Sequence, residues 1–195
     1  MLHYPGMKTL LSKPLVIYLF KFGGLFSLFY LGTLLVIGLC SKENFYSPFV
    51  STYLDFITPL RHSILRSAEY ILRIFGHSTI WIDQYTLGLK DGRSVRMVYS
   101  CIGYGVLSFW AAFILANPKG LKVTIIWLVC GWALLWALNV LRIFFLLLAI
   151  NNNSGVKFEI DHHTFYNIIA YCCIFLMIFF YDRSRRRGLK QVGVL

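Results

Sequence analysis

Three kinds of chemically reactive side chain lie where polar segments of the chain meet apolar runs. Cys101 follows a charged segment and opens the apolar run that ends at Ala116. Arg142 lies inside the next apolar run, and the pair His162 and His163 directly precedes the last one. A thiolate is a strong nucleophile, a nearby guanidinium favours the thiolate, and an imidazole transfers protons near neutral pH. Together these residue types suit covalent catalysis by a cysteine.

Each of these residues also has a non-catalytic interpretation. A cysteine at the end of an apolar run often only fills space, and adjacent histidines beside Asp161 often lie in a solvated loop. Arg142 could extend to lipid headgroups. The histidines and Asp161 could bind a metal, but adjacent helical residues point about 100° apart and chelate one ion poorly. We therefore expect no metal site, and nothing in the sequence indicates a cofactor.

The composition identifies an integral membrane protein. Hydrophobic residues make up 58% of the chain and charged residues 14%, whereas soluble proteins carry about 25% charged residues. The 195 residues allow about four or five spans of roughly 20 residues, so we expect a single multi-pass domain over residues 1–195. The net charge of +11 comes from basic clusters beside apolar runs. Such clusters are typical of orientation signals and anionic-lipid contacts, and we expect no nucleic-acid binding.

The cysteine pattern favours free thiols over disulfides. All five cysteines lie inside or at the edge of apolar runs, at Cys40, Cys101, Cys130, Cys172 and Cys173. No metal-type CxxC spacing occurs. We expect no role in chemistry for the four cysteines other than Cys101.

Four apolar segments are predicted to cross the membrane as helices. They comprise residues 22–40, 97–116, 121–150 and 164–181, and the second begins at Met97 or Ile102. The first run exceeds the apolar region of about 7–15 residues in a signal peptide and lacks a convincing cleavage site. We therefore expect it to remain as an anchor.

The basic clusters predict the orientation of these spans. Lys8 and Lys13 precede the first span, Lys119 and Lys122 lie between the second and third, and an arginine cluster follows the last. Basic loops stay in the cytoplasm, so four spans place both termini there, in the inner membrane. Cys101 and the histidines then face outward. Arg142 lies roughly 12 Å inside the outer end of the third span. Its long side chain can extend outward to the depth of the Cys101 thiol.

An amphipathic helix is predicted between the first and second spans. Residues 56–75 place apolar side chains at spacings of three and four, opposite a stripe formed by His62, Arg66, Glu69 and Arg73. Three arginines make this helix a poor membrane span. We predict an interfacial helix on the outer leaflet, and packing against the spans is equally compatible with the pattern.

The segment from Ser78 to Ser100 has a β pattern. Short β-prone runs at 80–82, 85–87 and 95–99 surround a turn signal at 90–93. This pattern predicts a small extracytoplasmic β hairpin that leads to Cys101 and borders a substrate groove. The expected fold is therefore an all-α integral membrane protein with about four transmembrane helices, an interfacial amphipathic helix and this hairpin.

Three landmarks, in this order, resemble the exosortase/archaeosortase family of integral-membrane cysteine transpeptidases. Tyr99-Ser100-Cys101-Ile102-Gly103 is similar to the family's ACSG-like motif at the start of a span. Asn139-Val140-Leu141-Arg142-Ile143 lies late in the next span, and a histidine opens the last. The resemblance covers about residues 77–182. Ile102 departs from the serine that usually follows the cysteine, and Asn167 stands where a glycine is common.

The resemblance implies a function and a role for each site residue. Members cleave a C-terminal sorting signal from exported, membrane-anchored proteins at the outer face of the inner membrane, without a cofactor. By analogy, Cys101 is the nucleophile, Arg142 its electrostatic partner, and His163 the acid/base, with His162 as the alternative. The other interpretation is a non-catalytic membrane subunit of a surface-polymer export or assembly system, in which Arg142 is a packing or lipid anchor.

Overall fold

The computed structural model describes residues 13–41, 45–151 and 162–191, and for 13–14, 162–167 and 184–191 it describes the backbone alone. The elements in chain order are α1 (Lys13–Cys40), α2 (Pro48–Tyr53), α3 (Ile57–Ile74), β1 (Thr79–Asp83), β2 (Thr86–Leu89), β3 (Ser94–Arg96), the 3₁₀ turn η1 (Tyr99–Ile102), α4 (Tyr104–Ala116), α5 (Leu121–Asn151) and α6 (His162–Gln191). The structure is mostly helical and has one small sheet.

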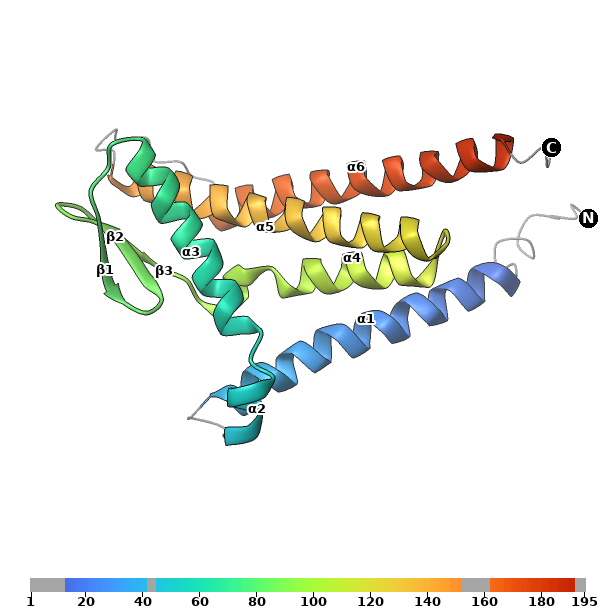
Figure 1. The fold of residues 1–195 in the computed structure, drawn as a ribbon, viewed down its shortest axis with the longest axis horizontal. Coiled ribbons are helices and arrows are strands. Elements are labelled where there is room, and N and C mark those ends of the chain that lie inside the picture. The colour runs from blue at the N-terminus through green and yellow to red at the C-terminus, as the bar shows by residue number, and fades with distance from the viewer. Residues whose placement is uncertain (1–12, 42–44, 152–161, 192–195) are drawn as a thin grey trace, which may run out of the picture.

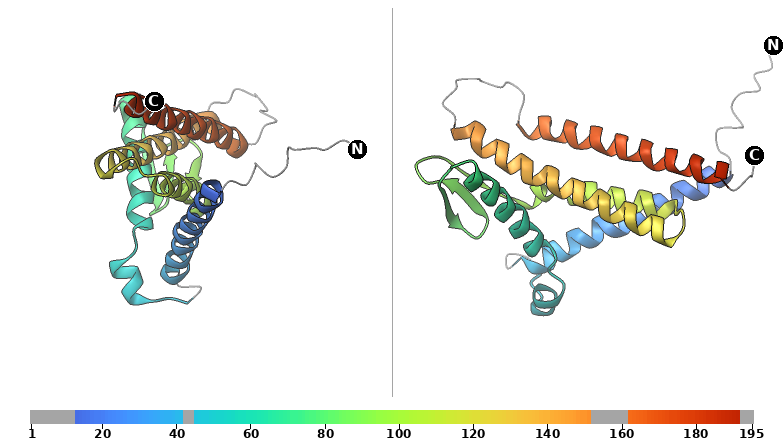
Figure 2. Two further views of the ribbon diagram at one scale, coloured as in Figure 1. Left: turned by 90° about the vertical axis from the view of Figure 1, so that its right-hand side faces the viewer. Right: turned by 45° about the horizontal axis from the view of Figure 1, so that its top comes forward.

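The long helices run lengthwise through the molecule, and the sheet lies at one end (Figure 1). Helix α3 crosses the bundle obliquely near this end. The start of α1, the α4–α5 connection and the end of α6 lie at the opposite end of the bundle, as the right-hand view of Figure 2 also shows. Among the described residues, the two ends of the bundle therefore differ: one end carries the sheet and α3, and the other carries helix ends and a short connection.

Two described helices are long and apolar enough to cross a bilayer. They comprise Leu15–Cys40, with 26 residues, and Leu121–Asn151, with 31 residues. Helix α4 is also apolar but has 13 residues, which gives a length of about 20 Å. Aromatic contacts join α4 to α1, including the rings of Phe22 and Phe109, whose centroids are 5.3 Å apart. These features establish an apolar helical bundle suited to a membrane.

Helix α4 begins later than Met97, one of the two predicted starts of the second span. Met97 N–H donates to Tyr85 C=O at 2.8 Å and so still belongs to the sheet. The chain then forms η1, and Gly103 adopts the left-handed conformation, with φ 76°, before α4 starts. The predicted alternative start, Ile102, lies within two residues of the observed one. The apolar pattern missed this break because a positive-φ glycine leaves the apolar run uninterrupted.

Helix α3 packs its apolar face against the bundle and the sheet, which was the alternative to a free interfacial helix. Its buried residues contact α5 and β2 in one core, whose members include Ile64, Leu65, Ala68, Leu72, Leu87, Val140, Ile143 and Leu147. Trp136 Nε1 on α5 donates to Ser63 Oγ at 3.0 Å. Phe75, expected on the apolar face, is 67% exposed. The amphipathic pattern therefore reflects contact with protein along most of the helix.

The β element is a three-stranded antiparallel sheet in the order β1-β2-β3, where a hairpin was expected. A second turn, between β1 and β2, explains the difference. Asp83 accepts hydrogen bonds from Tyr85 N–H at 2.6 Å and from the Thr86 hydroxyl at 2.9 Å. These bonds hold the pKa of the Asp83 carboxyl below its ordinary value. The expected turn at 90–93 joins β2 to β3.

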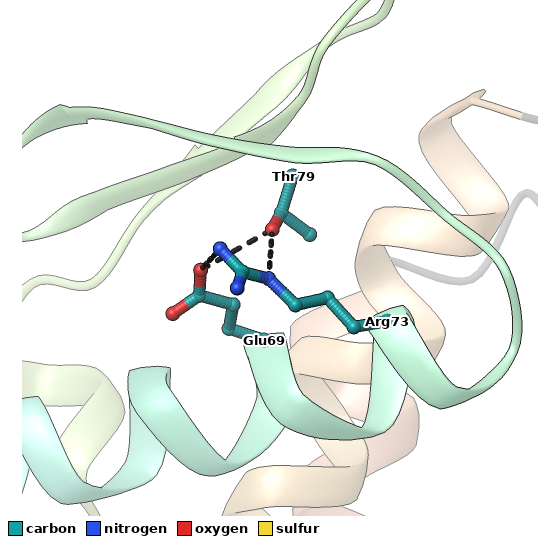
Figure 3. Close-up of polar contacts among 3 residues, drawn as sticks. All are labelled: Glu69, Arg73 and Thr79. Atoms are coloured by element: carbon teal, nitrogen blue, oxygen red, sulfur yellow. Dashed lines mark hydrogen bonds and ion pairs between the residues drawn. The ribbon is translucent and has the colours of Figure 1, made fainter.

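Polar contacts attach both ends of the sheet to the helices. At the start of β1, Arg73 binds Glu69 at 2.6 Å and donates from Nε to Thr79 Oγ1 at 3.2 Å (Figure 3). At the β2–β3 turn, Asn151 at the end of α5 accepts from Arg93 N–H at 2.5 Å and donates to Arg93 C=O at 3.2 Å. The sheet is thereby held to α3 and α5.

Candidate active site

Cys101 lies in η1, between the sheet and α4. Its N–H donates to Val98 C=O at 3.0 Å. The next residue, Ile102, is fully buried in the core, and its C=O accepts a 2.9 Å hydrogen bond from Asn139 Nδ2. A Cβ on Gly103 would lie 3.2 Å from that same nitrogen, and its positive φ disfavours other residues. The thiol therefore sits on a short turn that is fixed on both sides.

Arg142 contacts the thiol of Cys101. Its Nη2 lies 3.6 Å from Cys101 Sγ, a hydrogen bond across two elements that are 41 residues apart in the sequence. Asn139 precedes Arg142 by one helical turn, so both side chains lie on the same face of α5. On this face of α5, Asn139 binds the backbone of the turn and Arg142 contacts the thiol of Cys101.

The two histidines are placed only by their backbone. Helix α6 begins at His162, and the side chains of His162 and His163 lie outside the described residues. Their proton-transfer role therefore remains a prediction. The described part of α6 does reach the site, because Ala170 and Tyr171 line a pocket together with Arg142.

This pocket has a volume of about 230 Å³ and adjoins Arg142 and Ser100. Its walls come from α1, the start of α4, α5 and α6, and include Tyr30, Gly103, Tyr104, Gly105, Val106, Leu135 and Asn139. The first main-chain bond of α4 runs from Leu107 N–H to Gly103 C=O at 3.0 Å. The N–H groups at the start of a helix have no partner within it, and the residues at the start of α4 line this pocket.

Arg61 is a site-supporting residue that the sequence reasoning missed. It is only 4% exposed, and its Nη2 donates to Met97 C=O, at the end of the strand that leads to Cys101. Its guanidinium carbon lies 3.6 Å from the centroid of the Tyr85 ring and 4.5 Å from that of Tyr99. Burial lowers the pKa of this guanidinium, and Tyr99 and Tyr85 oppose the change.

A signal for Arg61 was present in the helical spacing. Arg61 lies four residues after Ile57 and four before Leu65, both of which are buried. That spacing places it on the buried face of α3 and not on the polar stripe. Asn139 was part of a landmark, and its separation of three residues from Arg142 already indicated a shared face of the helix.

Comparison with known protein families identifies the family of the chain. Residues 43–180 match the family model of the transmembrane exosortases (Exosortase_EpsH). No curated protein and no solved structure matches the chain. The matched range is more than half of the chain, and it includes the turn at Cys101 and the face of α5 that holds it. The family resemblance of the three landmarks is thus confirmed, and the chain belongs to the transmembrane exosortase family.

Proposed function

We propose that the protein is a membrane-embedded cysteine peptidase or transpeptidase that cleaves a C-terminal sorting signal from exported proteins. Its substrates are membrane-anchored proteins, and the cut is made at the outer face of the inner membrane. The observation that carries this proposal is the contact of 3.6 Å between Arg142 Nη2 and Cys101 Sγ. A permanently charged guanidinium beside a thiol favours the nucleophilic thiolate.

The proposed reaction passes through a thioester. The Cys101 thiolate attacks the scissile carbonyl carbon, and the oxyanion that forms is stabilised by Arg142 or by the free N–H groups at the start of α4. The C–N bond then breaks, and the leaving amine takes a proton from His163, or from His162 as the alternative. Water or another nucleophile attacks the thioester, releases the product acyl group and restores the thiol.

The proposed topology has four spans: α1, α4, α5 and α6. The start of α1 and the end of α6 lie at the same end of the bundle and carry basic residues, as do the α4–α5 connection with Lys119 and the first turn of α5 with Lys122. Such clusters are retained in the cytoplasm. The sheet, α3 and Cys101 then face outward, where exported substrates arrive.

The contact between Cys101 and Arg142 also bears on the alternative of a non-catalytic subunit. That alternative expects Arg142 to extend to lipid headgroups. The guanidinium instead contacts a thiol that is itself held in a fixed turn. A lipid anchor has no need of this arrangement, so the contact favours the enzyme.

A reporter substrate tests the proposed activity. The reporter carries the C-terminal region of a protein from the same genome that ends in a short motif, an apolar helix and an arginine cluster. Co-expression should remove this region, Cys101→Ala should abolish the removal, and wild-type enzyme should accumulate a hydroxylamine-sensitive adduct with the reporter. Replacement of the four other cysteines by alanine is the matched control and should leave cleavage intact. Normal cleavage by Cys101→Ala at equal abundance would refute the thiol mechanism.

A further inference from the structure

Strand β3 is an edge strand of the three-stranded sheet, and its outer edge faces away from β2. Met97 N–H donates to Tyr85 C=O at 2.8 Å, so this amide points to β2. Along an antiparallel strand, alternate residues direct their N–H and C=O groups to the same side. The groups of Ser94 and Arg96 therefore point away from β2. Within the described ranges no hydrogen bond reaches them from that side.

This edge leads directly to the thiol. The backbone stays extended through Val98, whose φ is −85° and ψ 162°. By the same alternation, Val98 N–H is the last outward donor of the edge. Val98 C=O then accepts the N–H of Cys101 at 3.0 Å and begins the turn that carries the nucleophile. A chain paired with this edge would thus pass beside the thiol.

Burial and hydrogen bonds anchor the strand that forms this edge to the rest of the fold. Leu87 and Met97, on the two paired strands, are fully buried. Arg61 holds the C=O of Met97, and Asn151 holds the turn before β3 through Arg93. A preformed strand loses little conformational freedom on pairing, so more of the hydrogen-bond energy remains for binding.

The side chains along the edge are accessible. Ser94 and Arg96 are exposed, and Val98 is 46% exposed. Side chains of alternate residues share a face of a strand, so these three form one exposed row that ends next to Cys101. Val98 supplies apolar surface at the end nearest the thiol, and Arg96 supplies a positive charge farther away.

We propose that the outer edge of β3 binds the substrate segment that contains the scissile bond, as an added antiparallel or parallel β-strand. This inference rests on the proposed function and names how the substrate is held. Backbone pairing presents an extended chain with its carbonyl groups in regular positions, and the turn after Val98 brings Cys101 beside one of them. The unpaired groups of an edge strand form a template for pairing with another chain.

The opposite edge of the sheet does not fit this role. It is formed by β1, which is separated from β3 by β2. Two strand spacings separate the two edges, so β1 lies about 10 Å from β3. Its start is also tied to α3 through Thr79 (Figure 3). Position Thr79 on β1 therefore provides a control for changes made on β3.

The first test removes one outward donor without touching the sheet ladder. Arg96→Pro deletes an N–H that points away from β2, and Arg96→Ala deletes the same side chain but keeps the N–H. Loss of a backbone hydrogen bond and obstruction by the ring should lower cleavage of the reporter by about tenfold or more in Arg96→Pro. Arg96→Ala should stay within about twofold of wild type, and the far-edge control Thr79→Pro should stay within about twofold of Thr79→Ala, which removes the same hydroxyl. Such differences are too small to represent a lost hydrogen bond.

The second test does not depend on how well a proline variant folds. Cys101→Ala, which leaves the reporter uncut, carries a photoreactive p-benzoylphenylalanine in place of Arg96 or, as a control, of Ile82 on β1, which is also exposed. Illumination should cross-link the reporter from position 96 and not from position 82. Adducts from 82 alone, or full activity of a well-accumulated Arg96→Pro, would overturn the proposal. If the wild type itself fails to cut the reporter, the proposed function fails instead.

Discussion

At the scale of single residues, the site depends on two arginines with different surroundings. Arg142 contacts the thiol of Cys101 from α5, and Arg61 holds the strand before it from α3. Arg142 is partly buried beside a pocket, whereas Arg61 is enclosed by two tyrosine rings. In the proposed reaction, the guanidinium of Arg142 can act on the charge that develops at the thiol or the oxyanion. Arg61 can act only through the geometry of the turn.

We expect Arg142→Lys to be nearly as inactive as Arg142→Ala. A lysine keeps the charge but lacks the planar set of donors that can meet a thiolate or an oxyanion. Removal of one oxyanion donor typically costs about 10²- to 10³-fold in rate, so both variants should lose at least that much reporter cleavage at normal membrane abundance. Full activity of Arg142→Lys would exclude this role, and poor accumulation of Arg142→Ala would indicate a structural one.

Arg61→Met should displace the thiol without changing any group that contacts it. The change leaves Met97 C=O buried without its donor, a loss of about 1–3 kcal/mol, and removes the stacking between the tyrosines. We expect slower alkylation of Cys101 by iodoacetamide in a background whose other cysteines are alanine. Arg61→Lys should recover part of the rate because it keeps the charge on the rings.

The control for Arg61 is Arg66→Met, an exposed position on the same helix. It should leave the alkylation rate at the wild-type value. Equal alkylation rates in Arg61→Met and Arg66→Met, with Arg61→Met folded, would show that Arg61 does not position the turn.

At the scale of elements, the close approach of α4 and α5 determines how the turn at Cys101 meets Arg142. Gly131 on α5 faces the indole of Trp110 on α4, and a Cβ at Gly131 would overlap that ring. Trp110 is fully buried and donates from Nε1 to Trp127 C=O at 3.1 Å. The absence of a side chain at Gly131 therefore leaves room for the indole of Trp110 between the two helices.

Gly131→Ala should separate α4 from α5 and destabilise the protein. Overpacking of this kind costs about 1–3 kcal/mol, which outweighs the gain in helix propensity of about 1 kcal/mol from glycine to alanine. The midpoint of thermal unfolding in detergent should fall. Gly24→Ala in α1, where an added Cβ meets no atom within 4 Å, should leave the midpoint unchanged or raise it, and an equal fall in both variants would contradict this packing argument.

At the scale of the whole molecule, the two ends of the bundle have different chemistry. One end carries the sheet, α3 and the thiol, and the other carries the basic α4–α5 connection and the end of α6. At that second end, Lys119 donates to Tyr181 C=O and lies 3.6 Å from the centroid of its ring, while the Tyr181 hydroxyl donates to Asn117 C=O at 2.6 Å. These contacts join α6 to the α4–α5 connection.

The proposed topology predicts which single cysteines a membrane-impermeant maleimide can label in intact cells. In a background without native cysteines, Lys90→Cys in the β2–β3 turn should react from outside. Lys122→Cys, at the α4–α5 connection, should react only after the membrane is permeabilised. Both positions are exposed in the structure, so a missing reaction reflects the membrane. Labelling of Lys90→Cys only after permeabilisation would place the thiol in the cytoplasm and overturn the outward-facing site.

The sequence alone was sufficient to identify the family and the membrane character, because both depend on local properties. Apolar runs, basic clusters and three short landmarks are read along the chain without knowledge of what lies opposite each residue. The amphipathic spacing of α3 and the β pattern before Cys101 were equally local. Their presence was predicted correctly, although the two-stranded hairpin proved to be a sheet of three strands.

Only the tertiary structure decided which partners these elements meet. The apolar stripe of α3 is the same whether it faces lipid or protein, and the core with α5 showed that it faces protein. Arg61 became a buried support, and Asn139 a donor to Ile102, because of contacts between residues distant in the chain. The break before α4 likewise required the observed φ of Gly103. Pairings across the fold leave no periodic trace in one sequence, so the contact between Cys101 and Arg142 was an expectation until the helices were placed.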